Sequence, residues 1–135
     1  MAKPRPRPKR LPGFTERVQT GCGGLYVTVN RDELGVFEVF AVLGHVGGCP
    51  PAQLEALGRM LSLNLRSGVK LSALVKQIQG IRCPKSQLLE GDIEGVLSCA
   101  DGMAKVLAGE DDGAEVPVDA PPAPVESIEQ CVKNA

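Results

Sequence analysis

The sequence contains no tryptophan, and aromatic residues make up only 3% of it, although 43% of its residues are hydrophobic. A core of this chain must therefore be built from leucine, valine and alanine. No run approaches the roughly 18 apolar residues of a membrane-spanning helix. The basic start leads into Leu11, Pro12 and Gly13 rather than into the apolar centre of a signal peptide. We therefore expect a cytoplasmic protein with no membrane contact.

The motifs of several enzyme classes are also missing. The sequence has no Ser/His/Asp set, no paired carboxylates and no dinucleotide-binding fingerprint. The glycine-rich stretch from Gly44 to Gly48 holds the single histidine, His45, but lacks the Gly-Lys-Ser/Thr ending of a phosphate-binding loop. These absences do not favour catalysis by this chain acting alone.

Charge is concentrated at the two ends of the chain. Residues 1–10 carry five basic side chains and no acid, whereas residues 109–135 carry seven acids and one lysine. Both ends are rich in proline. We expect a disordered basic arm over residues 1–13, a folded domain over 14–108 and a disordered acidic tail over 109–135.

The hydrophobic pattern predicts an α+β domain. Residues 24–43 alternate between apolar and polar side chains around a loop at 31–35, which is typical of a β-hairpin. Leucines spaced along one face predict a helix from about Pro51 to Ser67, with Ala56, Met60 and Leu63 widening the stripe. A shorter helix is expected with an apolar face from Leu71 to Ile78 and its end at Gly80. A last helix is expected over about 99–108, begun by a capping box in which Ser98 is the N-cap and Asp101 stands at N3. We expect about three helices against one face of a small antiparallel sheet.

Four of the five cysteines lie at corners of the predicted backbone: Cys22, Cys49, Cys83 and Cys99. Four converging thiolates would form a tetrahedral site for zinc or for an iron–sulfur cluster. Because no Cys-x-x-Cys occurs, the spacing leaves open that these are small buried hydrophobic residues. Cys99 would begin a helix, whose dipole should lower the pKa of its thiol. Cys131, in the acidic tail, is either an exchangeable thiol or an incidental exposed one.

Several ordered motifs resemble those of a known domain. They are Thr20 to Asn30 (TGCGGLYVTVN), Phe37 to Phe40, Gly80 to Cys83 and Leu97 to Asp101 (LSCAD). Together they resemble the TSCPD domain over about residues 11–108. That domain occurs near the C-terminus of cobalamin-dependent ribonucleotide reductases and in small free-standing proteins. The name-giving Thr-Ser-Cys-Pro-Asp differs here at Leu97 and Ala100.

The resemblance implies a metal or cluster at Cys22, Cys49, Cys83 and Cys99, because free-standing members carry cysteines at these corners. Zinc is the expected metal, with an iron–sulfur cluster as the alternative. The resemblance also implies a role in deoxyribonucleotide synthesis and the label ribonucleoside-diphosphate reductase. A body of about 98 residues (11–108) is too small for a nucleotide pocket and cobalamin. We therefore expect an accessory module whose partner is a reductase catalytic subunit, which would supply any cobalamin.

Two other functions remain open from the sequence. The basic arm could bind the phosphates of a nucleic acid, although it has no aromatic residue on which a base could stack. Alternatively, the cysteines could cycle between thiol and disulfide as a redox carrier instead of holding a metal.

Overall fold

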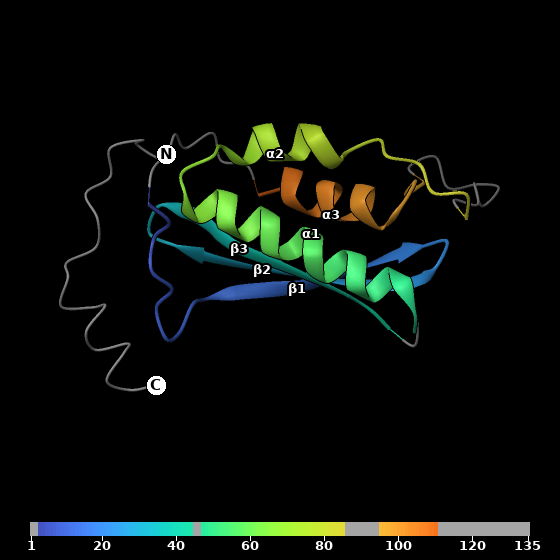
Figure 1. Ribbon diagram of the computed structural model, residues 1–135, viewed down its shortest axis with the longest axis horizontal. Helices are drawn as coiled ribbons and strands as arrows, with labels where there is room; N and C mark the ends of the chain where they lie inside the picture. The colour runs from blue at the N-terminus through green and yellow to red at the C-terminus, as the bar shows by residue number, and fades with distance from the viewer. Residues whose placement is uncertain (1–2, 45–46, 86–94, 111–135) are drawn as a thin grey trace.

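A three-stranded antiparallel sheet and three helices make up the described part of the chain in the computed structural model, which covers residues 3–44, 47–85 and 95–110 (Figure 1). The strands β1 (Gly13–Thr20), β2 (Gly23–Asp32) and β3 (Gly35–Leu43) lie in the order β1-β2-β3. The helices are α1 (Cys49–Arg66), α2 (Leu71–Ile78) and α3 (Cys99–Ala108). The predicted α+β class is confirmed.

The predicted hairpin is the pair of β2 and β3. Leu25, Val27 and Val29 of β2 are fully buried and lie opposite Leu43, Ala41 and Val39 of β3. Gly35 begins β3 with a φ of 121°, a left-handed conformation that few other residues adopt, so it permits the tight turn. The alternation seen in the sequence therefore separates a buried face from an open one.

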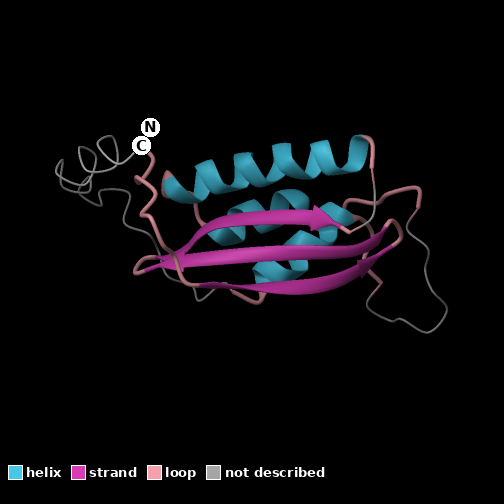
Figure 2. Cartoon of the chain, turned by 90° about the horizontal axis from the view of Figure 1, so that it is seen from below, coloured by secondary structure: helices cyan, strands magenta, loops and turns pink. Residues whose placement is uncertain are grey.

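The helices cover one face and one edge of the sheet. Helix α1 packs along β3, α3 packs on β1 and β2, and α2 packs on α3 (Figures 1 and 2). The buried helical side chains are Leu54, Leu61, Leu65, Val75, Ile78, Met103, Ala104, Val106 and Leu107. The three helices predicted from hydrophobic spacing are thus present within one or two residues of the expected bounds.

Three residues assigned to the buried stripe of α1 lie outside it, and Ala56 is one of these exposed residues. Met60 and Leu63 are 58% and 46% exposed. The face that meets β3 follows Leu54, Leu61 and Leu65, and positions 60 and 63 are turned away from it by the helical period. The stripe is therefore narrower than the sequence analysis expected.

Strand β1 was not predicted. It pairs with β2 along its whole length, from Gly13 opposite Asn30 to Thr20 opposite Gly23. Most of its residues are exposed because it forms an edge of the sheet. An exposed edge strand needs little apolar alternation, and Glu16 and Arg17 interrupt the pattern. The element order is therefore β-β-β-α-α-α instead of the expected β-β-α-α-α.

The N-terminal segment has no regular structure over residues 3–12, yet it is attached to the body. The backbone of Arg5 donates a hydrogen bond to the Arg66 carbonyl at 3.0 Å, and its guanidinium pairs with Asp32. Arg7 makes two hydrogen bonds to Glu38, at 2.9 and 2.8 Å. The basic, proline-rich composition of residues 1–13 predicts a disordered arm and gives no sign of these contacts. The proposed acidic tail lies outside the described residues beyond Glu110.

Within the ranges that the structure describes, no helix combines the length and apolarity needed to cross a membrane.

Candidate functional site

Three of the four predicted cysteine ligands lie around one small cavity. Cys22 comes from the β1–β2 turn, Cys83 from the segment after α2, and Cys99 from the start of α3, and these segments meet at one end of the molecule (Figure 1). Thr20 and Lys85 also line the cavity. Its volume is about 10 Å³, which is the space of roughly one water-sized sphere. The fold thus brings three thiols that are far apart in the sequence around a cavity with room for one ion or one water molecule.

Local hydrogen bonds fix the turn that carries Cys22. The Thr20 hydroxyl donates to the Gly23 carbonyl at 2.9 Å and accepts from the Cys22 amide at 3.2 Å. Gly23 has a φ of 124°, which closes the turn without a side-chain clash. Thr20 is buried, with 7% of its surface exposed. Sequence reasoning singled out the cysteine and overlooked the threonine that orients it.

A buried carboxylate holds the other two cysteine segments together. Asp101 accepts hydrogen bonds from the backbone amides of Gly80 at 2.8 Å and Leu97 at 3.0 Å. Close to it, the Cys83 amide donates to the Leu97 carbonyl at 2.9 Å. Asp101 therefore ties the end of α2 and the segment before α3 to α3 itself, and so places Cys83 beside Cys99.

The predicted cap of α3 is half confirmed. The Ser98 hydroxyl accepts from the Asp101 amide at 3.0 Å, as an N-cap does. The Asp101 carboxylate bonds Gly80 and Leu97. Burial raises the pKa of Asp101, but these two backbone hydrogen bonds and the nearby Lys105 outweigh burial and lower it overall. The sequence pattern could indicate the cap, but not the longer-range role of the carboxylate.

The pKa of the Cys99 thiol is raised, contrary to the expectation based on the helix dipole. Burial is the largest cause, and the neighbouring thiols of Cys22 and Cys83 raise it further. A hydrogen-bond contact between Thr20 Oγ1 and Cys99 Sγ, 3.9 Å apart, acts in the opposite direction and lowers the pKa. Without a bound cation, desolvation therefore prevails over the helix terminus, and the thiol form is favoured.

Cys49 is not among the residues around the cavity. It is exposed at the first residue of α1, where its Sγ accepts from Gln53 Nε2 at 3.8 Å. The start of α1 does lie at the same end of the molecule as the other three cysteine segments (Figure 1). As the side chains stand, no group of three or more His, Cys, Asp or Glu residues in the described ranges could hold a metal ion. His45 and Cys131 lie outside those ranges.

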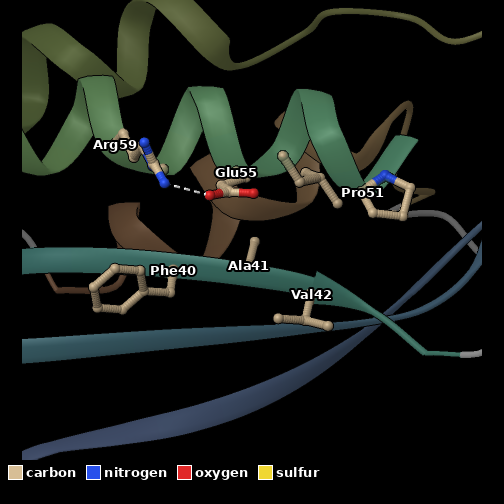
Figure 3. A pocket seen from close by; sticks show the side chains of 8 residues that line it. Phe40, Ala41, Val42, Pro51, Glu55 and Arg59 are labelled. Atoms are coloured by element: carbon tan, nitrogen blue, oxygen red, sulfur yellow. Dashed lines mark hydrogen bonds and ion pairs between the residues drawn. The ribbon is translucent and has the colours of Figure 1, made fainter. Parts of the chain in front are cut away.

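A second concavity lies between β3 and the first half of α1 (Figure 3). This groove has a volume of about 450 Å³ and is lined by Phe40, Ala41, Val42, Pro51, Leu54, Glu55, Gly58 and Arg59. Its polar groups are Arg59 and Glu55, which pair with each other at 2.6 Å. No motif of the sequence predicts this groove, and its lining includes no cysteine.

Comparison with known proteins identifies the family. A family model for the TSCPD domain matches residues 2–110, which include the N-terminal segment, all three strands and all three helices of the described structure. Comparisons with curated proteins and with solved structures give no match. The match covers most of the chain, and the chain belongs to the TSCPD domain family.

Proposed function

We propose that this protein is an accessory module of a ribonucleotide reductase, which binds the catalytic subunit or replaces its terminal domain. The observation that carries the proposal is the family match over residues 2–110, because the TSCPD domain is known from ribonucleotide reductases. The proposal places the protein in the cytoplasm, where thiols such as the four free cysteines of the described residues stay reduced.

The cysteine-lined cavity and the groove beside α1 support the proposal that the chain acts together with a catalytic partner. Ribonucleotide reduction needs thiols beside a nucleotide pocket. Here the clustered thiols surround only about 10 Å³, whereas the groove of about 450 Å³ is lined by no cysteine. A partner would therefore have to supply the nucleotide pocket and the radical-generating cobalamin.

We further propose that Cys22, Cys83 and Cys99 hold a zinc ion, with Cys49 as the fourth ligand. The donors are soft thiols, which suit zinc. A cavity of about 10 Å³ suits one ion better than a multi-atom iron–sulfur cluster. Bound zinc would supply a structural cross-link. Closing the site requires the sulfurs of Cys22, Cys83 and Cys99 to draw closer together, because they do not form a ligand set as they stand. It also requires the Cys49 side chain to leave Gln53 and turn toward them.

The accessory role is tested with a reductase catalytic subunit from which the terminal TSCPD domain has been removed. Deoxynucleotide formation is measured with ribonucleotide, adenosylcobalamin and a dithiol, with and without this chain. We expect the chain to bind the subunit and raise its activity, and to form no deoxynucleotide alone. Absence of both binding and stimulation would contradict the accessory role, and reduction by the purified chain alone would make it an enzyme.

The metal is tested by elemental analysis and an absorption spectrum of the protein as purified. About one zinc per chain is expected, with no visible absorption. A brown protein that contains iron would contradict the zinc proposal and support an iron–sulfur cluster. A metal-free protein with a reversible two-electron thiol titration would instead support the redox carrier.

A further inference from the structure

The sheet has an open face opposite its helices. We call it the outer face: the odd-numbered residues 13–19 of β1, the even-numbered residues 24–30 of β2 and 38–42 of β3, and Gly44, which directly follows β3. In Figure 2 the strands lie in front of the helices that pack behind them, so this face is toward the viewer. Figure 2 shows no described helix in front of it, and at its β3 edge Phe40 and Val42 also line the groove beside α1. Its chemistry is therefore available to a ligand.

Two aromatic rings lie on neighbouring strands of the outer face. Tyr26 is 43% exposed and Phe40 is 45% exposed. Tyr26 lies opposite Val42, and Phe40 lies opposite Thr28, so the two rings occupy diagonal positions within reach of each other. Figure 3 shows Phe40 and Val42 on the side of β3 away from α1, while Ala41 points toward the helix. An open face that presents two aromatic rings differs from an ordinary polar sheet surface.

The surroundings of Tyr26 are unusually flat. Gly24 and Gly44 lie next to it and are joined by a hydrogen bond from the Gly44 amide to the Gly24 carbonyl, at 3.0 Å. A Cβ added at Gly44 would lie 3.4 Å from Tyr26 Cε2. The ring therefore extends over bare backbone, which leaves room for a second planar group to lie against it.

Positive charge flanks the two rings. Arg17 lies directly opposite Tyr26 on β1, and a Cβ at Gly24 would be 2.9 Å from its Nε, so the guanidinium rests on this glycine. At the other end of the face, Arg7 binds Glu38 and thereby anchors the segment that carries the exposed Lys9 and Arg10.

The outer face has almost no negative charge to oppose these cations. Glu38 is the one acid among its residues, and it is 3% exposed and paired with Arg7 at 2.8 Å. Glu55 of α1 lines the groove beside Phe40, and it is paired with Arg59 at 2.6 Å. Exposed aromatic rings between cations, on the open face of a sheet, are the features by which proteins bind single-stranded nucleic acid.

We propose that the outer face binds single-stranded nucleic acid. Bases stack on Tyr26 and Phe40, while Arg17, Lys9 and Arg10 contact the phosphates. The N-terminal segment supplies charge and the sheet supplies the rings that this segment lacks. A duplex would bind less well, because its base faces are already stacked. This inference goes beyond the accessory role and does not depend on it.

The chain carries its own reporter for this interaction. Tyr26 is the only tyrosine and there is no tryptophan, so tyrosine emission comes from the proposed stacking site alone. The full chain is titrated with short oligo(U) and oligo(dT) at low and high salt. We expect saturable quenching that weakens with salt. Tighter binding of oligo(U) would identify RNA, and tighter binding of oligo(dT) would identify DNA; either supports the proposal.

Substitutions locate the binding on the outer face, with affinity measured by the anisotropy of a labelled oligonucleotide. Tyr26→Ala and Phe40→Ala should each weaken binding about tenfold or more, while Tyr26→Phe should retain it. Arg17→Ala should weaken binding and flatten its salt dependence. Met60→Ala is the control, because Met60 is also an exposed apolar residue, 58% accessible, but lies on α1. Circular dichroism checks that each variant folds.

Three outcomes would overturn the proposal. They are no binding at low salt, binding that leaves tyrosine emission and the two alanine variants unchanged, and equally tight binding of a duplex. None of them bears on the reductase assay, so the two proposals fail separately.

Discussion

At the scale of single residues, Ser62 explains how the edge of β3 is protected. Its buried hydroxyl accepts from the Val39 amide and donates to the Val39 carbonyl, each at 3.1 Å. An edge strand has unpaired backbone groups, and these two would otherwise be buried beneath α1 without partners. One side chain of α1 thus replaces the missing neighbouring strand at this position.

We therefore predict that Ser62→Ala destabilises the fold by about 1–3 kcal/mol, because it leaves two buried backbone groups unsatisfied. The free energy of unfolding is measured by denaturant titration. Ser72→Ala, at an exposed position of α2, is the matched control and should change stability little. Equal losses in the two variants would contradict this role of Ser62.

Glu38 links the N-terminal segment to the sheet and should make stability depend on pH. Burial opposes ionisation of its carboxyl, but hydrogen bonds from Arg7 and Asn30 outweigh it and lower the pKa below the ordinary value of 4.5. A pKa lowered by folding stabilises the native state above the unfolded-state pKa, and this stabilisation is lost as the pH falls through the folded-state pKa.

We predict that wild-type stability falls as the pH drops below about 4.5, and that Glu38→Gln is less stable at neutral pH by about 1 kcal/mol. Because glutamine does not ionise, the acid-induced loss should be smaller in this variant. Denaturant titrations from neutral to acidic pH measure both effects. Parallel stability curves for the two proteins would show that Glu38 is not the group responsible.

At the scale of elements, α3 depends on its cap. The Ser98 hydroxyl satisfies the Asp101 amide at 3.0 Å, one of the amides that a helix start leaves without an intrahelical partner. We predict that Ser98→Ala costs about 1 kcal/mol and that Ser98→Asp, which can also cap, costs much less. Thermal and denaturant unfolding provide the measurement. A loss in Ser98→Asp as large as in Ser98→Ala would mean that the cap contributes little.

The elements differ in how far the sequence could predict them. Helices α2 and α3 bury apolar residues at helical spacing and end near a glycine or begin at a cap, so local signals agree with the tertiary structure. Strand β1 buries mainly its last residue and is held by pairing with β2, a non-local interaction that leaves little trace in its own residues. Likewise, the partners of Arg5 and Arg7 lie 27 and 31 residues away in the sequence.

The candidate site was predictable to a similar extent. Cysteines next to glycine, proline or a helix cap indicated corners, and the fold gathers three of them. The residues that orient those corners, Thr20 and Asp101, act through backbone amides brought close by folding. No sequence spacing encodes such contacts. Cys49 shares the corner pattern but faces solvent, which a spacing argument cannot distinguish.

At the scale of the whole molecule, the proposed metal would join parts of the fold that lie far apart in the sequence. The β1–β2 turn, the segment after α2 and the start of α3 meet around a small cavity at one end of the molecule. The chain has few aromatic residues to strengthen its core. An ion bound only by the folded protein adds its binding free energy to stability. Metal content and thermal stability should therefore change together.

We predict that a chelator lowers the melting temperature of the purified protein. Cys83→Ser and Cys99→Ser should abolish metal binding and lower the melting temperature to a similar extent, because each removes a ligand and uncouples metal from folding. Cys49→Ser should also weaken metal binding. This variant tests Cys49 as the fourth ligand, because its side chain does not line the cavity that the other three cysteines surround. Cys131→Ser, outside the proposed set, is the control and should leave both quantities unchanged. Elemental analysis and thermal denaturation measure them; if Cys83→Ser, Cys99→Ser and Cys131→Ser all melt alike, the grouping of the cysteines is wrong.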